Sequence, residues 1–231
     1  MSMLVKICGI SNSLDAHSAI DAGASAIGFV MGGKCFPVEV EPHAQRVREI
    51  IRTFPANVDS FIVTHLLNAD DILDLSNYVR SSGIQISEEI DVSIVKEIRS
   101  RSHKKIIKTV VVRDESSIQK LKEYEPYCDY LLLDTVSAGY VGGTGRTNDW
   151  DLCKQMVAAA SKPVYLAGGL TPENVELGMD TVRPQGVDVA TGVSVFSDEY
   201  PGKDRKCPLR IKSFIQKAHA WHAKNASGVC A

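Results

Sequence analysis

The sequence alternates strand-like and helical segments eight times, and this alternation constrains the fold more than any other feature. Short apolar runs typical of buried strands are each followed by a segment whose apolar residues recur at helical spacing. The predicted strands cover residues 4–8, 26–31, 58–65, 83–87, 105–112, 129–134, 163–167 and 186–191. Regular alternation of this kind predicts a parallel sheet that is covered by helices.

Eight such units within 231 residues favour the α/β class and a closed (β/α)8 TIM barrel. The predicted helices cover residues 11–22, 42–54, 70–80, 92–100, 116–124, 150–160, 172–179 and 209–222. We expect a single barrel domain over residues 1–231, with a frayed tail at 223–231. A doubly wound open sheet is the alternative, but it would need a dinucleotide fingerprint after the first strand. Cys8-Gly9-Ile10-Ser11 is not such a fingerprint.

Composition excludes several classes of function. The formal net charge of −2 provides no basic field for nucleic acid, and no apolar run approaches the roughly 20 residues that span a bilayer. The N-terminus lacks the pattern of a signal peptide. The six cysteines have no CxxC pairing, and no pair of histidines has metal-site spacing, including the lone His65 after the third strand. We therefore expect a reduced cytoplasmic protein without a metal, a nucleic-acid partner or a membrane.

In a barrel of this kind, catalytic residues lie at the C-terminal ends of the strands. Cys8 ends the first strand, and strand alternation places Lys6 on the same side, facing the barrel mouth. A cation near a thiol favours the thiolate, which can act as a base or a nucleophile. Asp134 ends a very apolar sixth strand, and a partly desolvated carboxyl group is suited to donating protons. The structural alternatives are a buried core cysteine and a turn-forming aspartate.

Glycine-rich turns after the seventh and eighth strands predict a phosphate site. Gly168-Gly169 precedes a helix that we expect to begin at Pro172, with Thr171 as its N-cap. Thr191-Gly192-Val193 follows the eighth strand, and barrels commonly bind phosphate between these two turns. The loop 139–146 resembles a mobile loop that closes over a substrate. Plain strand-to-helix turns are the alternative, and the absence of a Gly-Lys-Ser/Thr motif argues against nucleotide hydrolysis.

Several motifs resemble those of the phosphoribosylanthranilate isomerase family of tryptophan biosynthesis, in register from residue 4 to about residue 217. They are Val5-Lys6-Ile7-Cys8-Gly9-Ile10, Leu132-Leu133-Asp134-Thr135, Gly142-Gly143-Thr144-Gly145 with Asp149-Trp150, the stretch 166–175, Gly186-Val187-Asp188, Thr191-Gly192-Val193 and Gly202-Lys203-Asp204. The resemblance implies a (β/α)8 barrel that needs neither cofactor nor metal. It also implies an aldose–ketose isomerase, which performs an Amadori rearrangement on its small-molecule phosphoribosyl substrate. That reaction converts N-(5-phosphoribosyl)anthranilate to 1-(2-carboxyphenylamino)-1-deoxyribulose 5-phosphate.

By position, the resemblance makes Cys8 the general base and Asp134 the general acid. Asp134 would protonate the ribose ring oxygen and open the furanose to a Schiff base. The Cys8 thiolate would then remove the C2′ proton, giving an enaminol that tautomerises to the ketose. The resemblance further implies that backbone amides hold the phosphate, and the predicted binding residues are Lys6, Lys34, Gln85, Gly143, Gly168, Gly169, Thr191, Gly192 and Val193.

The chain departs from the family pattern at two places. In the loop after the second strand, Pro37 stands where the family has the arginine that holds the anthranilate carboxylate, and Lys34 is the nearby cation. After the fourth strand Gln85 matches the family, but Ser87-Glu88 replaces His-Gly. These departures leave open a related barrel isomerase that acts on another 5-phosphoribosyl amine, and a non-catalytic barrel that binds a phosphorylated metabolite. Either a monomer or a homodimer is compatible with the sequence.

Overall fold

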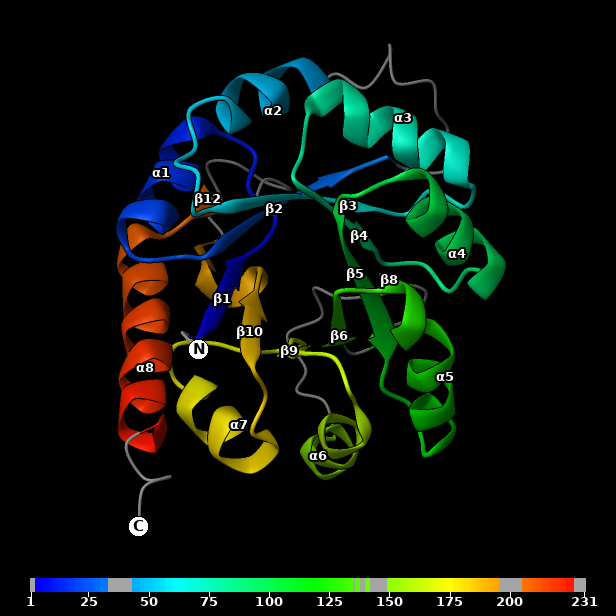
Figure 1. Ribbon diagram of the computed structural model, residues 1–231. Helices are drawn as coiled ribbons and strands as arrows, with labels where there is room; N and C mark the ends of the chain where they lie inside the picture. Colours follow the sequence, from blue (N-terminus) through cyan, green and yellow to red (C-terminus); the bar gives the residue numbers. More distant parts are fainter. Residues whose placement is uncertain are drawn as a thin grey trace.

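The structure is a computed structural model that describes residues 3–32, 43–134, 136–137, 140–141, 149–195 and 205–226. Eight parallel strands close into a barrel in the order β1-β10-β9-β6-β5-β4-β3-β2, with β2 returning to β1 (Figure 1). The strands are β1 Leu4–Ile7, β2 Ala26–Met31, β3 Asp59–Thr64, β4 Gly83–Ile86, β5 Lys105–Val111, β6 Tyr130–Asp134, β9 Val164–Leu166 and β10 Gly186–Val189. The predicted TIM barrel is confirmed, and the open-sheet alternative is wrong.

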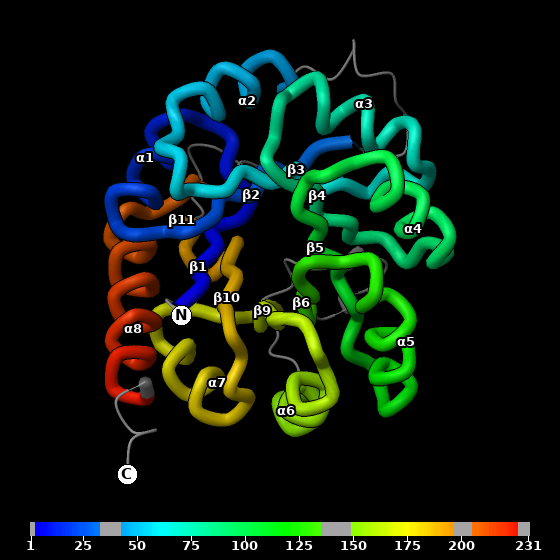
Figure 2. The backbone as a smooth tube through the Cα atoms, in the orientation of Figure 1, coloured from blue at the N-terminus to red at the C-terminus, as the bar shows by residue number. Residues whose placement is uncertain are grey.

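The helices form a ring around the strands, as the backbone tube in Figure 2 shows. They are α1 Ser13–Asp21, α2 Ala44–Ile51, α3 Ala69–Val79, α4 Val92–Arg101, α5 Ser116–Tyr124, α6 Trp150–Ala159, α7 Val175–Val182 and α8 Pro208–Ala226, and short 3₁₀ helices lie at Glu125–Tyr127 and Thr191–Val193. Helix α8 continues through residues 223–226, where the sequence predicted the start of a frayed tail.

The predicted start of α7 at Pro172 is wrong by three residues. Residues 171–174 form a separate hydrogen-bonded turn instead. In it, the hydroxyl of Thr171 accepts from the N–H of Glu173 at 3.1 Å, and the side chain of Asn174 accepts from the N–H of Thr171 at 2.8 Å. Thr171 is therefore not the N-cap of α7 that the sequence predicted. The regular helix begins at Val175, with Asn174 at the N-cap position.

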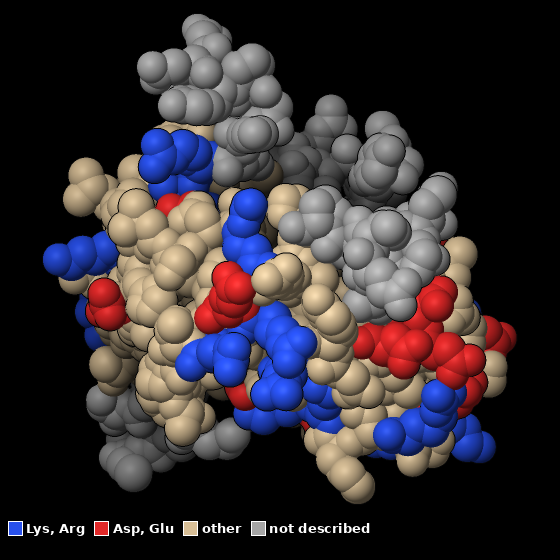
Figure 3. Space-filling view, turned by 90° about the horizontal axis from the view of Figure 1, so that it is seen from above, with Lys and Arg blue, Asp and Glu red and all other residues tan. Residues whose placement is uncertain are grey.

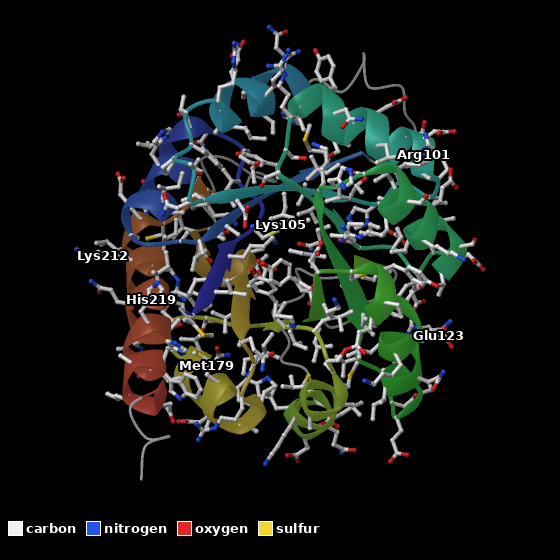
Figure 4. The ribbon with its side chains drawn as sticks, in the orientation of Figure 1. Arg101, Lys105, Glu123, Met179, Lys212 and His219 are labelled. Atoms are coloured by element: carbon white, nitrogen blue, oxygen red, sulfur yellow. The ribbon has the colours of Figure 1, made fainter. Side chains whose placement is uncertain are left out.

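The apolar residues divide into a barrel interior and a layer between strands and helices. The interior cluster is Ala26, Phe61, Ile107, Leu132, Tyr165 and Ala167, and all six are buried. At the N-terminal end of the strands, Lys105 donates to Asp59 at 2.6 Å. Figure 4 shows Lys105 over the strands, whereas Arg101, Glu123 and Lys212 project from the surrounding helices. Because this end of a barrel contributes to stability, we look for chemistry at the opposite end.

Two short antiparallel hairpins extend the barrel beyond the predicted elements. Strands β7 Val136–Ser137 and β8 Tyr140–Val141 pair within the long loop after β6. Strands β11 Ser194–Val195 and β12 Arg205–Lys206 pair after the 3₁₀ turn that follows β10. The second hairpin brings Lys206 opposite Ser194 in the register.

The face seen in Figure 3 carries both signs of charge, with Lys and Arg side chains gathered near its middle and Asp and Glu side chains gathered to one side. Among the residues that the structure describes, no helix is long and apolar enough to cross a membrane. The same described ranges contain no group of three His, Cys, Asp or Glu side chains that could hold a metal ion.

Candidate active site

Cys8 lies directly after β1, in a buried cluster with Lys6 and Asp188. The Nζ of Lys6 donates to Oδ1 of Asp188 at 2.9 Å across the β1–β10 pairing, and Lys6 is fully buried. The backbone N–H of Cys8 donates to the carbonyl of Val189 at 2.8 Å, which fixes the thiol at the end of the strand. The predicted grouping of Lys6 with Cys8 inside the barrel mouth is therefore what the structure shows.

The protonation of Cys8 differs from the simple expectation that a nearby cation favours its thiolate. Burial raises the pKa of Cys8, and the carboxylate of Asp188 raises it further, whereas Lys6 and Lys206 lower it without reversing the balance. Burial also acts to lower the pKa of Lys6, but Asp188 and Cys8 outweigh it and leave that pKa raised. The raised pKa of Cys8 favours the protonated thiol at neutral pH, beside the ion pair of Lys6 and Asp188.

Gly28 on β2 makes room for this cluster. A Cβ atom at position 28 would lie 2.9 Å from both the Sγ of Cys8 and the Nζ of Lys6. Contacts that short do not occur for real side chains, so any larger residue would displace one of the two groups. The sequence offered no signal for this role, because a glycine within a strand pattern has many explanations.

Asp134 and the two glycine turns line one pocket at the C-terminal ends of β6, β9 and β10. Its lining residues are Asp134, Ala167, Gly168, Gly169, Leu170, Asp188, Val189, Ala190 and Thr191. Asp134 ends β6 and is half-buried. Since β9 and β10 stand between β6 and β1 in the sheet order, Asp134 and Cys8 approach the barrel mouth from different sides. Asp188 belongs both to the pocket and to the Cys8 cluster.

The backbone of the two turns is arranged for an anion. Gly168 and Gly169 have φ of +78° and +68°, a region that favours glycine. Within the described residues, the N–H groups of Gly168, Gly169 and Gly192 donate to no protein acceptor. Amides left open at adjoining turns form the concavity in which phosphate oxygens bind. Val193 contributes less, because its N–H points towards the carbonyl of Ala190 at 3.5 Å.

The two turns touch directly, and α8 holds them together. A Cβ atom at Gly192 would lie 1.9 Å from the carbonyl oxygen of Leu170, so only glycine fits there. Arg210 of α8 donates from Nε to the carbonyl of Gly192 at 2.9 Å and from Nη2 to Glu173 at 2.8 Å. This arginine spans both turns and was not a sequence candidate.

The opposite side of the mouth contains Gln85, which matches the family pattern, and Ser87 and Glu88, which depart from it. Gln85 is buried and donates to Thr109 at 3.3 Å, while its Oε1 is buried without a partner in the described structure. Glu88 accepts from, or shares a proton with, Nδ1 of His65 at 2.8 Å. Ser87 is buried and its N–H donates to the carbonyl of Thr64 at 3.1 Å. The Glu88 carboxylate thus faces an imidazole, and Gln85 retains an unused acceptor.

Lys34, Pro37 and Gly143 lie outside the described residues, and so do the motif residues Thr135, Gly142, Thr144, Gly145, Gly202, Lys203 and Asp204. For Lys6, which was also a predicted binding residue, the structure shows contacts with Asp188 and the thiol, and its binding of substrate stays a prediction.

Comparison with known proteins decides the family. The family model described as N-(5'phosphoribosyl)anthranilate (PRA) isomerase matches residues 5–216. The chain belongs to this family. The predicted resemblance is therefore confirmed over nearly the whole chain.

Individual relatives agree in sequence and in fold. The N-(5'-phosphoribosyl)anthranilate isomerase of Methanothrix thermoacetophila is 32% identical over 94% of this chain and 98% of its own, and that of Desulforudis audaxviator is 36% identical over 93% and 97%. The crystal structure of the Thermotoga maritima phosphoribosyl anthranilate isomerase superposes with a TM-score of 0.79 at 33% identity, covering 94% of this chain and 99% of that one. A second structure, in complex with reduced 1-(o-carboxyphenylamino)-1-deoxyribulose 5-phosphate, has a TM-score of 0.73 at 32% identity, covering 94% and 99%.

Proposed function

We propose that this chain catalyses the Amadori rearrangement of N-(5-phosphoribosyl)anthranilate to 1-(2-carboxyphenylamino)-1-deoxyribulose 5-phosphate in tryptophan biosynthesis. Family membership supports this aldose–ketose isomerase activity, and a related structure that holds the reduced product analogue supports the substrate. The observation that carries the proposal is that Asp134, Gly168, Gly169 and Thr191 line one pocket, which shares Asp188 with the Cys8 cluster.

In this proposal the phosphate binds at the two glycine turns, where Gly168, Gly169 and Gly192 offer their amides. Asp134, in the lining of the same pocket, protonates the ring oxygen of the ribose, and the furanose opens to a Schiff base. Cys8 acts after losing its proton and removes the proton from C2′, which gives an enaminol. Proton return at C1′ completes the ketose, so the reaction needs no external oxidant or reductant.

The same arrangement assigns a further role to Gln85. Its buried Oε1 is an acceptor without a protein partner, and leaving such an atom unsatisfied costs on the order of 1–3 kcal/mol. A hydroxyl or amine N–H of the bound substrate would satisfy it. We expect Gln85 to orient the part of the substrate that lies away from the phosphate.

A fluorescence assay of N-(5-phosphoribosyl)anthranilate consumption tests the proposal with wild-type protein, Cys8→Ser and Asp134→Asn. We expect turnover in the wild type and a loss of at least 10²-fold in each variant, because each removes a proton-transfer group. Circular dichroism controls for folding. Wild-type protein that binds inorganic phosphate but shows no turnover would contradict the proposal and favour the non-catalytic barrel.

The second candidate is an isomerase that acts on a different 5-phosphoribosyl amine, and the pair of His65 and Glu88 is the observation that bears on it. Assaying Glu88→Gln with substrates that carry and lack an aromatic carboxylate separates the two. If Glu88 selects against the carboxylate, the variant lowers KM only for the carboxylate-bearing substrate. An unchanged preference supports the anthranilate substrate.

We also infer a cytoplasmic location, which the free thiols of Cys8, Cys128, Cys153 and Cys207 support among the described cysteines. A structure of monomers generated from the dimeric Thermotoga maritima enzyme supports a monomer or homodimer as the range of oligomeric states. We retain one barrel domain over residues 1–231 as the domain organisation.

A further inference from the structure

The β11–β12 hairpin places a buried lysine, Lys206, beside the 3₁₀ turn that follows β10. Lys206 is 5% exposed although it comes from a surface hairpin. Its Nζ donates to the carbonyl of Ala190 at 2.8 Å and to the hydroxyl of Ser194 at 3.0 Å. Both acceptors flank the 3₁₀ turn Thr191–Val193, so Lys206 fastens the hairpin to the turn that follows β10.

The same ammonium group lies beside Gly9, the residue that follows Cys8. The N–H of Cys8 donates to the carbonyl of Val189, the residue before Ala190. A Cβ atom placed on Gly9 would lie 3.3 Å from the Nζ of Lys206, so the ammonium borders the peptide that follows the thiol. Nothing in the sequence pattern marks this lysine, which lies 198 residues after Cys8 and outside the matched motifs.

The charged groups acting on Cys8 among the described residues are Lys6 from β1, Asp188 from β10 and Lys206 from β12. Burial raises the pKa of the thiol, and Asp188 adds to the rise, while Lys6 and Lys206 oppose it. Lys6 is paired with Asp188 at 2.9 Å, so its charge acts on the thiol together with an opposing carboxylate. Lys206 comes from a separate hairpin and adds its own positive charge near Sγ.

We propose that Lys206 is a positioning residue for the isomerase reaction, whose ammonium favours the thiolate of Cys8 while its hydrogen bonds hold residues 190–194 in place. This inference rests on the proposed function, in which Cys8 is the base. It differs from a purely structural role because the charge itself matters, and a neutral replacement changes the titration of Cys8.

The test compares the wild type with Lys206→Met, Lys206→Arg and Ser194→Ala in the full chain. Two properties are measured against pH: kcat/KM with N-(5-phosphoribosyl)anthranilate, and the rate at which iodoacetamide alkylates Cys8, read from the Cys8 peptide by mass spectrometry. In the alkylation, the thiolate forms an S–C bond and iodide leaves. Reading the peptide separates Cys8 from Cys207, which adjoins the substitution.

We expect Lys206→Met to move both midpoints upward, because the removal of a nearby positive charge disfavours the thiolate. A rise of one pH unit corresponds to tenfold less thiolate below the midpoint. Lys206→Arg keeps the charge and should keep the midpoint, even if its rate falls. Ser194→Ala removes two hydrogen bonds, the one from Lys206 and the one that the hydroxyl donates to the carbonyl of Ala190, but no charge. It should keep the midpoint as well.

The inference is overturned if the midpoints coincide in wild type and Lys206→Met and the rate losses are similar in all three variants. In that case Lys206 only holds residues 190–194 in place. If Lys206→Met loses its circular dichroism spectrum, Lys206→Gln gives the same neutral test with a donor retained for Ala190. A shifted alkylation midpoint in protein that does not turn over the substrate would support the charge effect while the proposed function fails.

Discussion

The buried pair of Lys6 and Asp188 allows a quantitative test of how the site is held together. Their Nζ–Oδ1 distance is 2.9 Å, with side-chain exposures of 0% and 8%. Asp188→Asn keeps the shape but leaves Lys6 as a buried cation without its carboxylate. Breaking a buried pair from one side typically destabilises a protein by about 3–5 kcal/mol. Since domains are stable by only about 5–15 kcal/mol, the variant should lose a large part of its free energy of unfolding.

A double-mutant cycle separates the pairing from the loss of either residue. Lys6→Met leaves Asp188 as the unpaired charge and should cost a similar amount. Lys6→Met/Asp188→Asn contains neither charge, and its remaining penalty is an amide with poor hydrogen bonding, about 1–3 kcal/mol. Urea unfolding of all four proteins at pH 7, followed by circular dichroism, gives the energies. If the two single losses simply add in the double variant, the reasoning is refuted.

The pH dependence of stability gives the cycle a second readout. In the wild type the folded pKa of Lys6 is raised, so its contribution is complete below the unfolded value of about 10.4 and is lost as pH rises through the folded pKa. In Asp188→Asn, burial acts without the carboxylate and lowers the folded pKa of Lys6. That variant should therefore gain stability as pH rises towards 10.4. A deficit that stays constant between pH 7 and pH 10 would contradict this account.

Three further predictions follow from single side chains. Gly192→Ala puts a Cβ 1.9 Å from the carbonyl of Leu170, so we expect KM for the phosphoribosyl substrate to rise at least tenfold while circular dichroism is retained. Arg210→Ala removes the hydrogen bond to the carbonyl of Gly192. Because this contact is partly exposed, we expect KM to rise up to about tenfold while kcat is kept. An unchanged KM in steady-state assays would contradict the role of Arg210 in holding the two turns together. Burial lowers the pKa of Lys108 to about 8, so its charge destabilises the fold below pH 8. Between pH 7.5 and 9.5 the wild type should therefore gain about 2 kcal/mol of unfolding free energy relative to Lys108→Met. Exposed Lys96→Met serves as the control without such a shift.

Much of the fold could be predicted because its signals are local. Each predicted barrel strand overlaps an observed one, and β2 has the predicted bounds of 26–31. The prediction failed at α7, where Thr171 and Asn174 satisfy backbone donors within a separate turn before the helix. Cap preferences indicate that donors near Thr171 are satisfied, but they do not say whether the next turn is regular α-helix.

The site could be predicted only in part, because its electrostatics depend on contacts between distant segments. Strand ends and glycine turns pointed to Cys8 and Asp134. The partner of Lys6 lies 182 residues away and is fixed by the β1–β10 register. Gly28 matters because two side chains from another strand fill the space above it. The sequence led us to expect a thiolate at Cys8. The direction of its pKa shift could not be predicted without knowing that burial outweighs the nearby cations.

The raised pKa of Cys8 is compatible with a role as base. Each unit of increase lowers the thiolate fraction at neutral pH tenfold, but it also makes the thiolate a stronger acceptor for a carbon-bound proton. The two effects partly offset each other: the thiolate is less populated, but each thiolate is a stronger base. Lys6 and Lys206 limit the rise, and Asp188 and burial set it. The rate of the proposed reaction should therefore keep increasing with pH above about 8.5, the value of an ordinary thiol, as a base with a raised pKa requires.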